Sequence, residues 1–316
     1  MSRLGVVTNP TAGSGRGARR GAEALAALSA RGHQLRDLSR GSWAASYEAA
    51  MAHRDDIDAL VVVGGDGMAH LGIQVCARTQ LPLGIVAAGS GNDGAAALGL
   101  PVHDIEASVR AIDAGLHGRV TRVDLGAMSG PSIDLPASPR YFLAVLSAGI
   151  DAAIAAYAAN LRYPRGPLKY KVATLRELPR FRPYGIRVRA DGAEWSQQCT
   201  LLAVANGPVL GGGLIVSPCS SVTDGKLELV IADSLQRRDI VKLFPKLYDG
   251  SHLADPRVRV IKVDSVQIDP VPDGAPLPPA FADGELVGAA PLTVTVAPGA
   301  LRVLGARPRQ PSGPVA

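Results

Sequence analysis

The chain has 316 residues, of which 47% are hydrophobic and 19% are charged, and its formal net charge is +5 with a pI near 9.3. This length predicts two domains, and the composition excludes a chain that is disordered throughout. The positive charge favours anionic partners such as phosphorylated molecules or an anionic membrane surface. Two Trp, four Phe and seven Tyr provide few rings on which bases can stack, so we do not expect nucleic acid binding.

The cysteines and the apolar segments bear on the cellular compartment. Three cysteines, odd in number and widely spaced, favour buried free thiols in a reducing compartment: Cys76, Cys199 and Cys219. The chain begins with a strand-like run rather than a signal-peptide pattern, so we expect a cytoplasmic protein. Residues 141–161 are apolar and long enough to cross a bilayer, but Asp151 would cost about 2.5 kcal/mol or more there. We therefore expect a strand, a turn and a helix in a soluble core.

The N-terminal third of the chain alternates between strands, glycine-rich loops and helices. Residues 4–8 form an apolar strand, and the loop at residues 9–17 runs into a helix that ends before Gly32. A second strand is predicted over residues 33–39 and a helix around residues 46–53. The loop is neither a dinucleotide fingerprint nor a P-loop, because it contains no Gly-Lys-Ser/Thr. An anion site and a plain connection both fit it.

The stretch from Val61 to Met68 carries the strongest chemical signal. Three consecutive valines indicate a buried parallel strand, and Gly64 and Gly65 predict a turn at which backbone N–H groups approach a ligand closely. Asp66 then lies at the carboxyl end of the strand, where open α/β sheets bind ligands. Carboxylate and phosphate repel each other unless a divalent cation lies between them, so the stretch predicts a metal–nucleotide site. The alternative is a structural Asp-Gly turn.

A third combination of strand, glycine loop and helix follows. After a helix from Met68 to about Arg78, residues 83–88 form a strand, residues 89–94 a glycine-rich loop and residues 95–98 a short helix. Three such loops at one edge of a parallel sheet favour a nucleotide site more strongly than one loop does. The next helix is predicted by the spacing of Ile105, Val109 and Ile112.

From about residue 119 the pattern changes to alternating polar and apolar residues, which predicts half-buried antiparallel strands. Such segments are residues 186–189, 258–260 and 293–296, and tight-turn signals lie at Asp191-Gly192, Asp224-Gly225, Asp273-Gly274 and Asp283-Gly284. The helices expected here span residues 152–160, 168–178 and 238–248, and residues 300–305 form the last strand. The sequence therefore predicts an α/β domain followed by a mostly-β domain, with the active site in the cleft between them.

The three glycine loops and six further motifs follow one another along nearly the whole chain. They are Asn9-Pro10-Thr11-Ala12-Gly13, Gly64-Gly65-Asp66-Gly67, Gly89-Ser90-Gly91-Asn92-Asp93, Asp124-Leu125-Gly126, Gly149-Ile150-Asp151, Asn206-Gly207, Gly211-Gly212-Gly213, Asp224-Gly225 and Asp283-Gly284-Glu285. This series resembles the bacterial diacylglycerol kinase-like lipid kinases. The resemblance implies a phosphofructokinase-like three-layer α/β nucleotide domain and a β-sandwich-type lipid domain. It also implies ATP-dependent phosphorylation of a lipid hydroxyl.

The resemblance also implies domain limits. We expect residues 1–122 to form the ATP-binding domain and residues 123–299 to form the lipid-substrate domain. Residues 300–307 are candidates to pack back on the first domain. Residues 308–316, rich in Pro, Gly and Ser, are expected to be a flexible tail.

Site residues follow from the matching motifs. The resemblance places the ATP site at Asn9, Pro10, Thr11, Ala12, Gly13, Ser39, Gly64, Gly65, Asp66, Gly67, Ser90 and Asn92. It implies that Asp66 meets the catalytic Mg²⁺, and that Asp224 binds a second, structural metal with the carbonyls of Ser221 and Lys226. Glu285 resembles the family's proton acceptor, with Asp283 beside it. Without the resemblance, the two Asp-Gly pairs at 224 and 283 would be interpreted as hairpin turns.

Two departures from the family pattern remove polar groups, and a third change is conservative. Met68 stands where Thr is usual, which removes a hydroxyl, and His70-Leu71 replaces the usual Asn-Glu. The third loop has Gly89-Ser90 instead of Gly-Thr, which keeps the hydroxyl. The loss of Asn-Glu argues against an NAD kinase, a related enzyme in which that pair helps to bind the acceptor nucleotide.

The expected function is that of an ATP- and Mg²⁺-dependent lipid kinase, with diacylglycerol as the favoured acceptor. A sphingoid, ceramide or polyprenol acceptor, a soluble acceptor such as NAD, and a nucleotide-binding regulator with little turnover are the alternatives. A run of basic residues predicts peripheral association with an anionic membrane surface. A basic face that is merely solvated also fits this run, which consists of Arg162, Arg165, Lys169, Lys171, Arg176, Arg180 and Arg182. A homodimer is a candidate assembly that the sequence does not specify.

Overall fold

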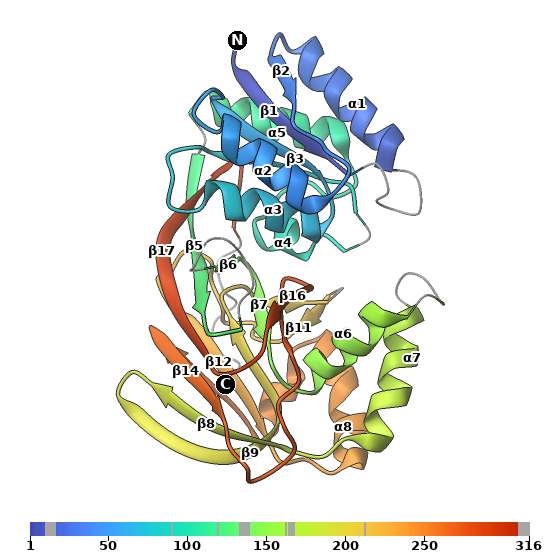
Figure 1. The fold of residues 1–316 in the computed structure, drawn as a ribbon, viewed down its shortest axis with the longest axis vertical. Coiled ribbons are helices and arrows are strands. Elements are labelled where there is room, and N and C mark those ends of the chain that lie inside the picture. Colours follow the sequence, from blue (N-terminus) through green and yellow to red (C-terminus); the bar gives the residue numbers. More distant parts are fainter. Residues whose placement is uncertain are drawn as a thin grey trace. The chain divides into compact units, whose positions relative to one another are not determined.

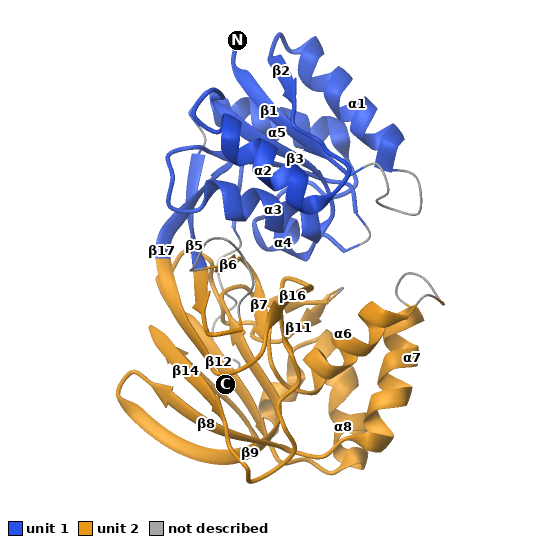
Figure 2. Cartoon of the chain, in the orientation of Figure 1, with its two compact units in different colours: residues 1–125, 298–309 blue, residues 126–297, 310–316 orange. Residues whose placement is uncertain are grey.

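The chain was analysed as a computed structural model, which describes residues 1–9, 17–89, 91–118, 120–132, 140–161, 163, 168–211 and 213–308. It divides into two compact units (Figure 2). Unit 1 comprises Met1–Leu125 and Pro298–Arg309, and unit 2 comprises Gly126–Ala297. The predicted tail at 308–316 lies outside the described residues except for its first residue.

Unit 1 contains a parallel sheet in the order β2-β1-β3-β4-β17 (Figure 1). Its strands are β1 (Arg3–Thr8), β2 (Gln34–Asp37), β3 (Ala59–Gly64), β4 (Leu83–Ala87) and the end of β17 (Leu292–Leu304). Its helices are α1 (Gly17–Ala30), α2 (Trp43–His53), α3 (Asp66–Cys76), α4 (Asp93–Ala97) and α5 (Ile105–Leu116). All the strands and helices predicted here are confirmed.

Helices cover both faces of this sheet, as its continuous apolar strands require. On one face, Ala24 and Leu28 of α1 and Ile112 of α5 belong to the same buried cluster as Val61 and Val86. On the other face, α3 lies so close to the sheet that a side chain at Gly72 would collide with Leu83 and approach Val62 closely. The expected three-layer α/β arrangement is therefore present in unit 1.

Helices α2, α3 and α4 each begin two or three residues before the predicted start, α4 at Asp93 instead of Ala95. Helix α2 begins three residues early because the Ser42 side chain accepts a hydrogen bond from Ala45 N at 3.1 Å and caps the helix. Helix α3 already begins at Asp66, directly after the turn at Gly65.

Unit 2 is dominated by antiparallel strands, as the alternating sequence pattern predicts. They are β5 (Val120–Ser129), which starts in unit 1, β6 (Arg140–Phe142), β7 (Val145–Ser147), β8 (Tyr184–Ala190), β9 (Ala193–Ala205), β10 (Val209–Leu210), β11 (Leu214–Ile215), β12 (Leu227–Asp233), β13 (Val258–Val263), β14 (Ser265–Pro270), β15 (Ala280–Ala282), β16 (Glu285–Gly288) and the start of β17. Strand β9 is central, because it pairs with β8 and β7 along one edge and with β12 along the other.

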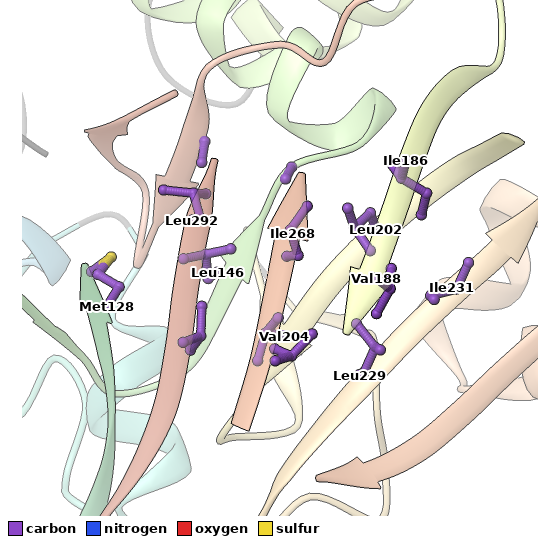
Figure 3. Packing of buried hydrophobic residues seen from close by; sticks show 14 of the residues in the cluster. Met128, Leu146, Ile186, Val188, Leu202, Val204, Leu229, Ile231, Ile268 and Leu292 are labelled. Carbon is purple, nitrogen blue, oxygen red and sulfur yellow. The ribbon is translucent and has the colours of Figure 1, made fainter. Parts of the chain in front are cut away.

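Helices and apolar clusters complete unit 2. The helices are α6 (Ile150–Asn160), α7 (Leu168–Glu177) and α8 (Arg237–Leu243), with 3₁₀ turns η2 (Leu178–Arg180), η3 (Phe244–Tyr248) and η4 (Ser251–Ala254). The main core gathers side chains from β7, β8, β9, β12 and β14, among them Leu146, Val188, Val204, Leu229 and Ile268 (Figure 3).

Three further expectations can be compared with unit 2. The helix predicted over 238–248 was wrong in its second half, where the chain turns into 3₁₀ at Phe244 because Pro245 cannot continue an α-helix. Residues 141–161 form β6, β7 and α6, as expected, and no helix among the described residues is long and apolar enough to span a bilayer. Cys76 and Cys199 are buried free thiols, but Cys219 is partly exposed.

Candidate functional site

The glycine loops of unit 1 share one edge of the sheet. Strands β1, β3 and β4 run parallel and adjacent, so their carboxyl ends meet there. Asn9 N donates to Val63 O at 3.3 Å, and the amides of Ala88 and Gly89 both donate to Gly64 O, at 2.8 and 3.1 Å. The chain segments that follow the three strands are therefore bonded to one another.

Asp66 connects the second glycine loop to the third. Its Oδ2 accepts a hydrogen bond from Asn92 N at 2.8 Å, and its Oδ1 accepts one from Gly94 N at 3.3 Å. A Cβ at Gly91 would lie 2.3 Å from Oδ2, so the carboxylate occupies the space that any other residue would need. The carboxylate therefore fixes the relative position of the two loops.

Asn92 and Gly89 shape the third loop from within. Asn92 has a left-handed backbone, with φ of 76°, and its side chain bridges Gly89, accepting from its N and donating to its O, each at 3.0 Å. A Cβ at Gly89 would lie 2.2 Å from Gly65 Cα. Only glycine permits this approach, which brings two backbone segments together at the edge where an anion would bind.

Ser39, an expected ATP contact, lies beside the end of β1. Its Oγ accepts from Thr8 N at 2.9 Å and lies 3.2 Å from Thr8 Oγ1. The other expected contacts Pro10, Thr11, Ala12, Gly13 and Ser90 lie outside the described residues.

Two side chains at this edge were missed by sequence reasoning. Arg20 of α1 donates to Ala88 O, next to Gly89, and Trp43 Nε1 at the start of α2 donates to Gly67 O at 3.3 Å. The Trp43 ring also stacks on Tyr47, with centroids 5.4 Å apart. No local sequence motif predicts these contacts, because each hydrogen-bond partner is more than twenty residues away in the sequence.

In unit 2, Asp283 and Gly284 form the tight turn between β15 and β16. Both residues have positive φ, 51° and 82°, and the flanking Ala282 and Glu285 are paired. This is the backbone that a two-residue type I′ hairpin requires. The turn interpretation of Asp283-Gly284 is therefore correct, and the turn sets the position of Glu285 as the first residue of β16.

The Asp283 carboxylate holds a distant segment. Its Oδ2 and Oδ1 accept from the amides of Leu143 and Ala144, at 2.7 and 2.8 Å. Asn206 bonds the same segment, because its Nδ2 donates to Leu143 O at 2.6 Å and its N donates to Ala144 O at 2.8 Å. Two motifs that are far apart in the sequence thus hold the same connection between β6 and β7.

Arg140 is a cation that interacts electrostatically with Glu285. This residue of β6 is largely buried, and its Nη1 donates to Leu286 O at 3.1 Å. Burial lowers the pKa of the Arg140 guanidinium, and the negative charge of Glu285 opposes that effect. The predicted proton acceptor therefore has a partly desolvated guanidinium beside it, which sequence reasoning missed.

Comparison with known proteins decides the family. Residues 3–128 match the family model described as diacylglycerol kinase catalytic domain, and residues 144–305 match the YegS C-terminal NAD kinase beta sandwich-like domain. A diacylglycerol kinase of Mycobacterium tuberculosis is 32% identical over 98% of this chain and 96% of its own length. The chain belongs to the diacylglycerol kinase family.

More distant relatives agree with this family. A diacylglycerol kinase of Bacillus subtilis is 24% identical over 85% of this chain and 86% of its own length. A solved structure of a diacylglycerol kinase from Bacillus anthracis str. Sterne has the same fold, with a TM-score of 0.67 at 18% identity over 97% of both chains. Membership of the family makes this protein a lipid kinase, which is a phosphotransferase.

The departures from the usual pattern of the diacylglycerol kinase family lie in buried positions of α3. Met68, His70 and Leu71 are all buried, and a Cβ at Gly64 would lie 2.5 Å from Met68 Cγ. The Nε2 atom of His70 lies 3.4 Å from the side-chain nitrogen of Gln74, and the His70 ring contacts the Trp43 ring. Met68 therefore fills the space above the glycine turn where the family usually has a threonine.

The proposed second metal site has an ammonium next to its carboxylate. Asp224 Oδ1 accepts from Lys226 N at 3.2 Å, and Oδ2 accepts from Lys262 Nζ at 2.9 Å. The same Nζ lies 3.8 Å from the buried Glu228 carboxylate. Ser221 bonds Thr223 through their hydroxyls, at 3.1 Å. Lys262 thus supplies positive charge at this place, and a metal bound by Asp224 stays a prediction.

Asp151, at the start of α6, gives a pH-dependent prediction. Burial raises the pKa of its carboxyl group. The folded chain therefore holds this proton more tightly than the unfolded chain, so stability is lost as pH rises through the folded pKa. We expect Asp151→Asn, which cannot ionise, to melt like the wild type at about pH 4 and at a higher temperature at about pH 8. A difference in melting temperature that does not change with pH would contradict this.

A cavity of about 460 Å³ in unit 1 is lined by residues 54–55, 57–58 and 78–81, which precede β3 and β4. It is thus at the sheet edge opposite to the glycine loops. We assign it no part in phosphoryl transfer.

Proposed function

We propose that this protein transfers the γ-phosphoryl group of Mg²⁺-bound ATP to the free hydroxyl of diacylglycerol, forming phosphatidic acid. The observation that carries the proposal is the carboxylate of Asp66, which accepts hydrogen bonds from the amides of the third glycine loop. Relatives named diacylglycerol kinase, one of them 32% identical over nearly the whole chain, support the choice of acceptor.

Unit 1 supplies what phosphoryl transfer demands of a protein, which is positioning and neutralisation of oxygen charge. The carboxyl ends of β3 and β4 lie side by side, and the Arg20 guanidinium at Ala88 supplies positive charge next to the third glycine loop. Mg²⁺, when bound, would neutralise the phosphate oxygens.

Asp66 fits the role of Mg²⁺ ligand. No three His, Cys, Asp or Glu side chains among the described residues are grouped to hold a metal. A Mg²⁺ ion that arrives with ATP usually needs only one or two carboxylates in addition to the phosphates and waters. Each carboxylate oxygen has two acceptor positions, so Asp66 can bond the loop amides and still bind the ion or one of its waters.

Unit 2 supplies the group that takes the proton from the acceptor hydroxyl. Glu285 is half-buried at the start of β16, and the turn before it is held by the bonds of Asp283 to Leu143 and Ala144. A carboxylate accepts the hydroxyl proton as the new O–P bond forms. The buried Arg140 guanidinium places positive charge near Glu285.

The test is transfer of label from γ-labelled ATP into solvent-extractable lipid, with Mg²⁺, mixed micelles and a panel led by diacylglycerol. We expect labelled phosphatidic acid, and weaker or no labelling of sphingoid, ceramide and polyprenol acceptors. Labelling of one of those lipids instead of diacylglycerol would contradict the proposed acceptor. NADP formed from NAD would contradict the lipid substrate.

A nucleotide-binding regulator with little turnover is the second candidate. Met68 and Leu71, both buried in α3, favour it because they remove polar groups from the helix that follows the glycine turn. Tight ATP binding without labelled product across the whole panel would support this candidate. Met68→Thr is then the first reversion to make.

A further inference from the structure

Trp43 connects the start of helix α2 to the start of helix α3. Its indole Nε1 donates a hydrogen bond to Gly67 O at 3.3 Å. Gly67 follows Asp66 directly and belongs to the first turn of α3. Helices α2 and α3 pack against each other in unit 1 (Figure 1). The bond from α2 therefore restrains the backbone next to the proposed Mg²⁺ ligand.

The indole ring is itself held in place by its neighbours. Trp43 is the first residue of α2, directly after the capping residue Ser42. Its ring stacks on the ring of Tyr47, one turn further along α2, with an interplanar angle of 8°. The ring of His70, which is fully buried in α3, lies 6.4 Å away and is tilted by 38°. With ring neighbours on both helices, the indole has little freedom to turn away from Gly67.

The backbone around Asp66 is flexible by composition and needs such a restraint. Asp66 lies between Gly65 and Gly67, and glycine has more conformational freedom than any other residue. Gly65 is the N-cap residue of α3 and offers no side-chain cap to the helix. The Asp66 carboxylate bonds two amides at the third glycine loop, which fixes it from that side. The Trp43 bond adds a restraint from α2.

We propose that Trp43 is a positioning residue for the binding of Mg²⁺-bound ATP and for phosphoryl transfer. Its indole N–H holds Gly67 and thereby keeps the Asp66 carboxylate where the ion needs it. Mg²⁺ demands near-ideal coordination geometry, so a carboxylate that moves out of line binds it less well. The proposal rests on the proposed function, because that function gives Asp66 its ion.

Trp43→Phe tests this role, because phenylalanine keeps a ring beside Tyr47 and lacks the N–H that bonds Gly67. We expect the Kd for ATP with Mg²⁺, measured by equilibrium dialysis without a lipid, to rise about five- to tenfold. Without Mg²⁺, the wild type and the variant should bind ATP equally, because Trp43 acts through the ligand of the ion. Unchanged binding with Mg²⁺, or the same weakening without Mg²⁺, would overturn the proposal. A packing role alone would lower only the melting temperature.

A double-variant cycle checks that the effect passes through Asp66. In the Asp66→Asn background, the carboxylate that Trp43 positions is absent. We therefore expect Trp43→Phe to change the Kd for ATP with Mg²⁺ by less than about twofold there. A full five- to tenfold effect in that background would show that Trp43 acts independently of Asp66, and would overturn the proposal.

Trp195→Phe is the matched control. Trp195 is the second of the two tryptophans of the chain and lies on β9 in unit 2. Its Nε1 is buried and has no hydrogen-bond partner among the described residues. We expect this variant to bind ATP and to turn over as the wild type does. Weakening equal to that of Trp43→Phe would contradict a specific role of the Trp43 indole.

A second measurement separates this inference from the proposed function. The rate of diacylglycerol phosphorylation in micelles is measured for the same variants, and we expect kcat of Trp43→Phe to fall about five- to tenfold. Mg²⁺-dependent ATP binding that requires Trp43, in a protein that phosphorylates no diacylglycerol, would overturn the proposed function alone. Diacylglycerol phosphorylation with equal kcat and equal ATP binding in the wild type and Trp43→Phe would overturn the role of Trp43 alone.

Discussion

Asp66→Asn is expected to lower kcat for phosphoryl transfer at least about a thousandfold. The substitution removes the negative charge proposed to meet Mg²⁺. It also turns one of the two hydrogen-bond acceptors into a donor, which would face the N–H of Asn92 or Gly94. The measurement is the rate of label transfer from ATP to diacylglycerol, together with a thermal melt. We expect the free energy of unfolding to fall by no more than the loss of one hydrogen bond, which is about 1–3 kcal/mol.

A glycine variant and its control separate the effect of the Asp66 charge from the effect of the position of its carboxylate. Gly91→Ala keeps the carboxylate but places a Cβ where Oδ2 now lies, so we expect a raised KM for ATP and a reduced kcat. Gly41→Ala, where a Cβ would meet no atom within 4 Å, should behave as the wild type. Full activity of Asp66→Asn would refute the role of this carboxylate in the reaction.

Glu285→Gln is expected to reduce kcat at least about a hundredfold, because glutamine cannot accept the proton of the lipid hydroxyl. KM for ATP should be unchanged, because the nucleotide loops belong to unit 1. Glu285 is half-buried on β16 and glutamine has nearly the same shape, so we expect at most a small decrease in melting temperature, from the loss of the negative charge near the buried Arg140. Measured steady-state kinetics with diacylglycerol in micelles give both constants.

Asp283→Asn is the companion variant for Glu285. The Asp283 carboxylate accepts hydrogen bonds from the amides of Leu143 and Ala144. These bonds fix the turn that carries Glu285, so Asp283 acts as a positioning residue. Asparagine tolerates the left-handed backbone but offers one acceptor instead of two. We expect a loss of stability of about 1–3 kcal/mol with a smaller loss of kcat than in Glu285→Gln. A large kcat loss without a change in melting temperature would make Asp283 catalytic instead.

The strands and loops of unit 1 could be predicted from the sequence because their signals are local. The valine run at β3 and the glycines after it fix a strand and a turn within eight residues. The contacts of Arg20, Trp43 and Arg140 could not be predicted, because each joins segments that are distant in the chain. Such contacts depend on the folded arrangement of elements and leave no periodic or local pattern.

Strand β17 shows how a local signal can mislead. The sequence predicts separate strands at residues 293–296 and 300–305. The structure instead has one strand, Leu292–Leu304, in which Gly299 N donates to Asp124 Oδ1 at 2.7 Å. Pro298 and Gly299 lie where the chain leaves unit 2 and enters unit 1.

Because the chain returns to unit 1 at its C-terminal end, the sheet of unit 1 can be completed only late in synthesis on the ribosome. Val303 pairs with Leu83 of β4, so a strand that borders β4 in the first unit to be synthesised comes from nearly the last residues. Until β17 has left the ribosome, β4 has an unpaired edge that can pair with another chain. We therefore expect a nascent or truncated chain that stops at residue 128 to expose an aggregation-prone strand edge, which synthesis of the C-terminal segment covers.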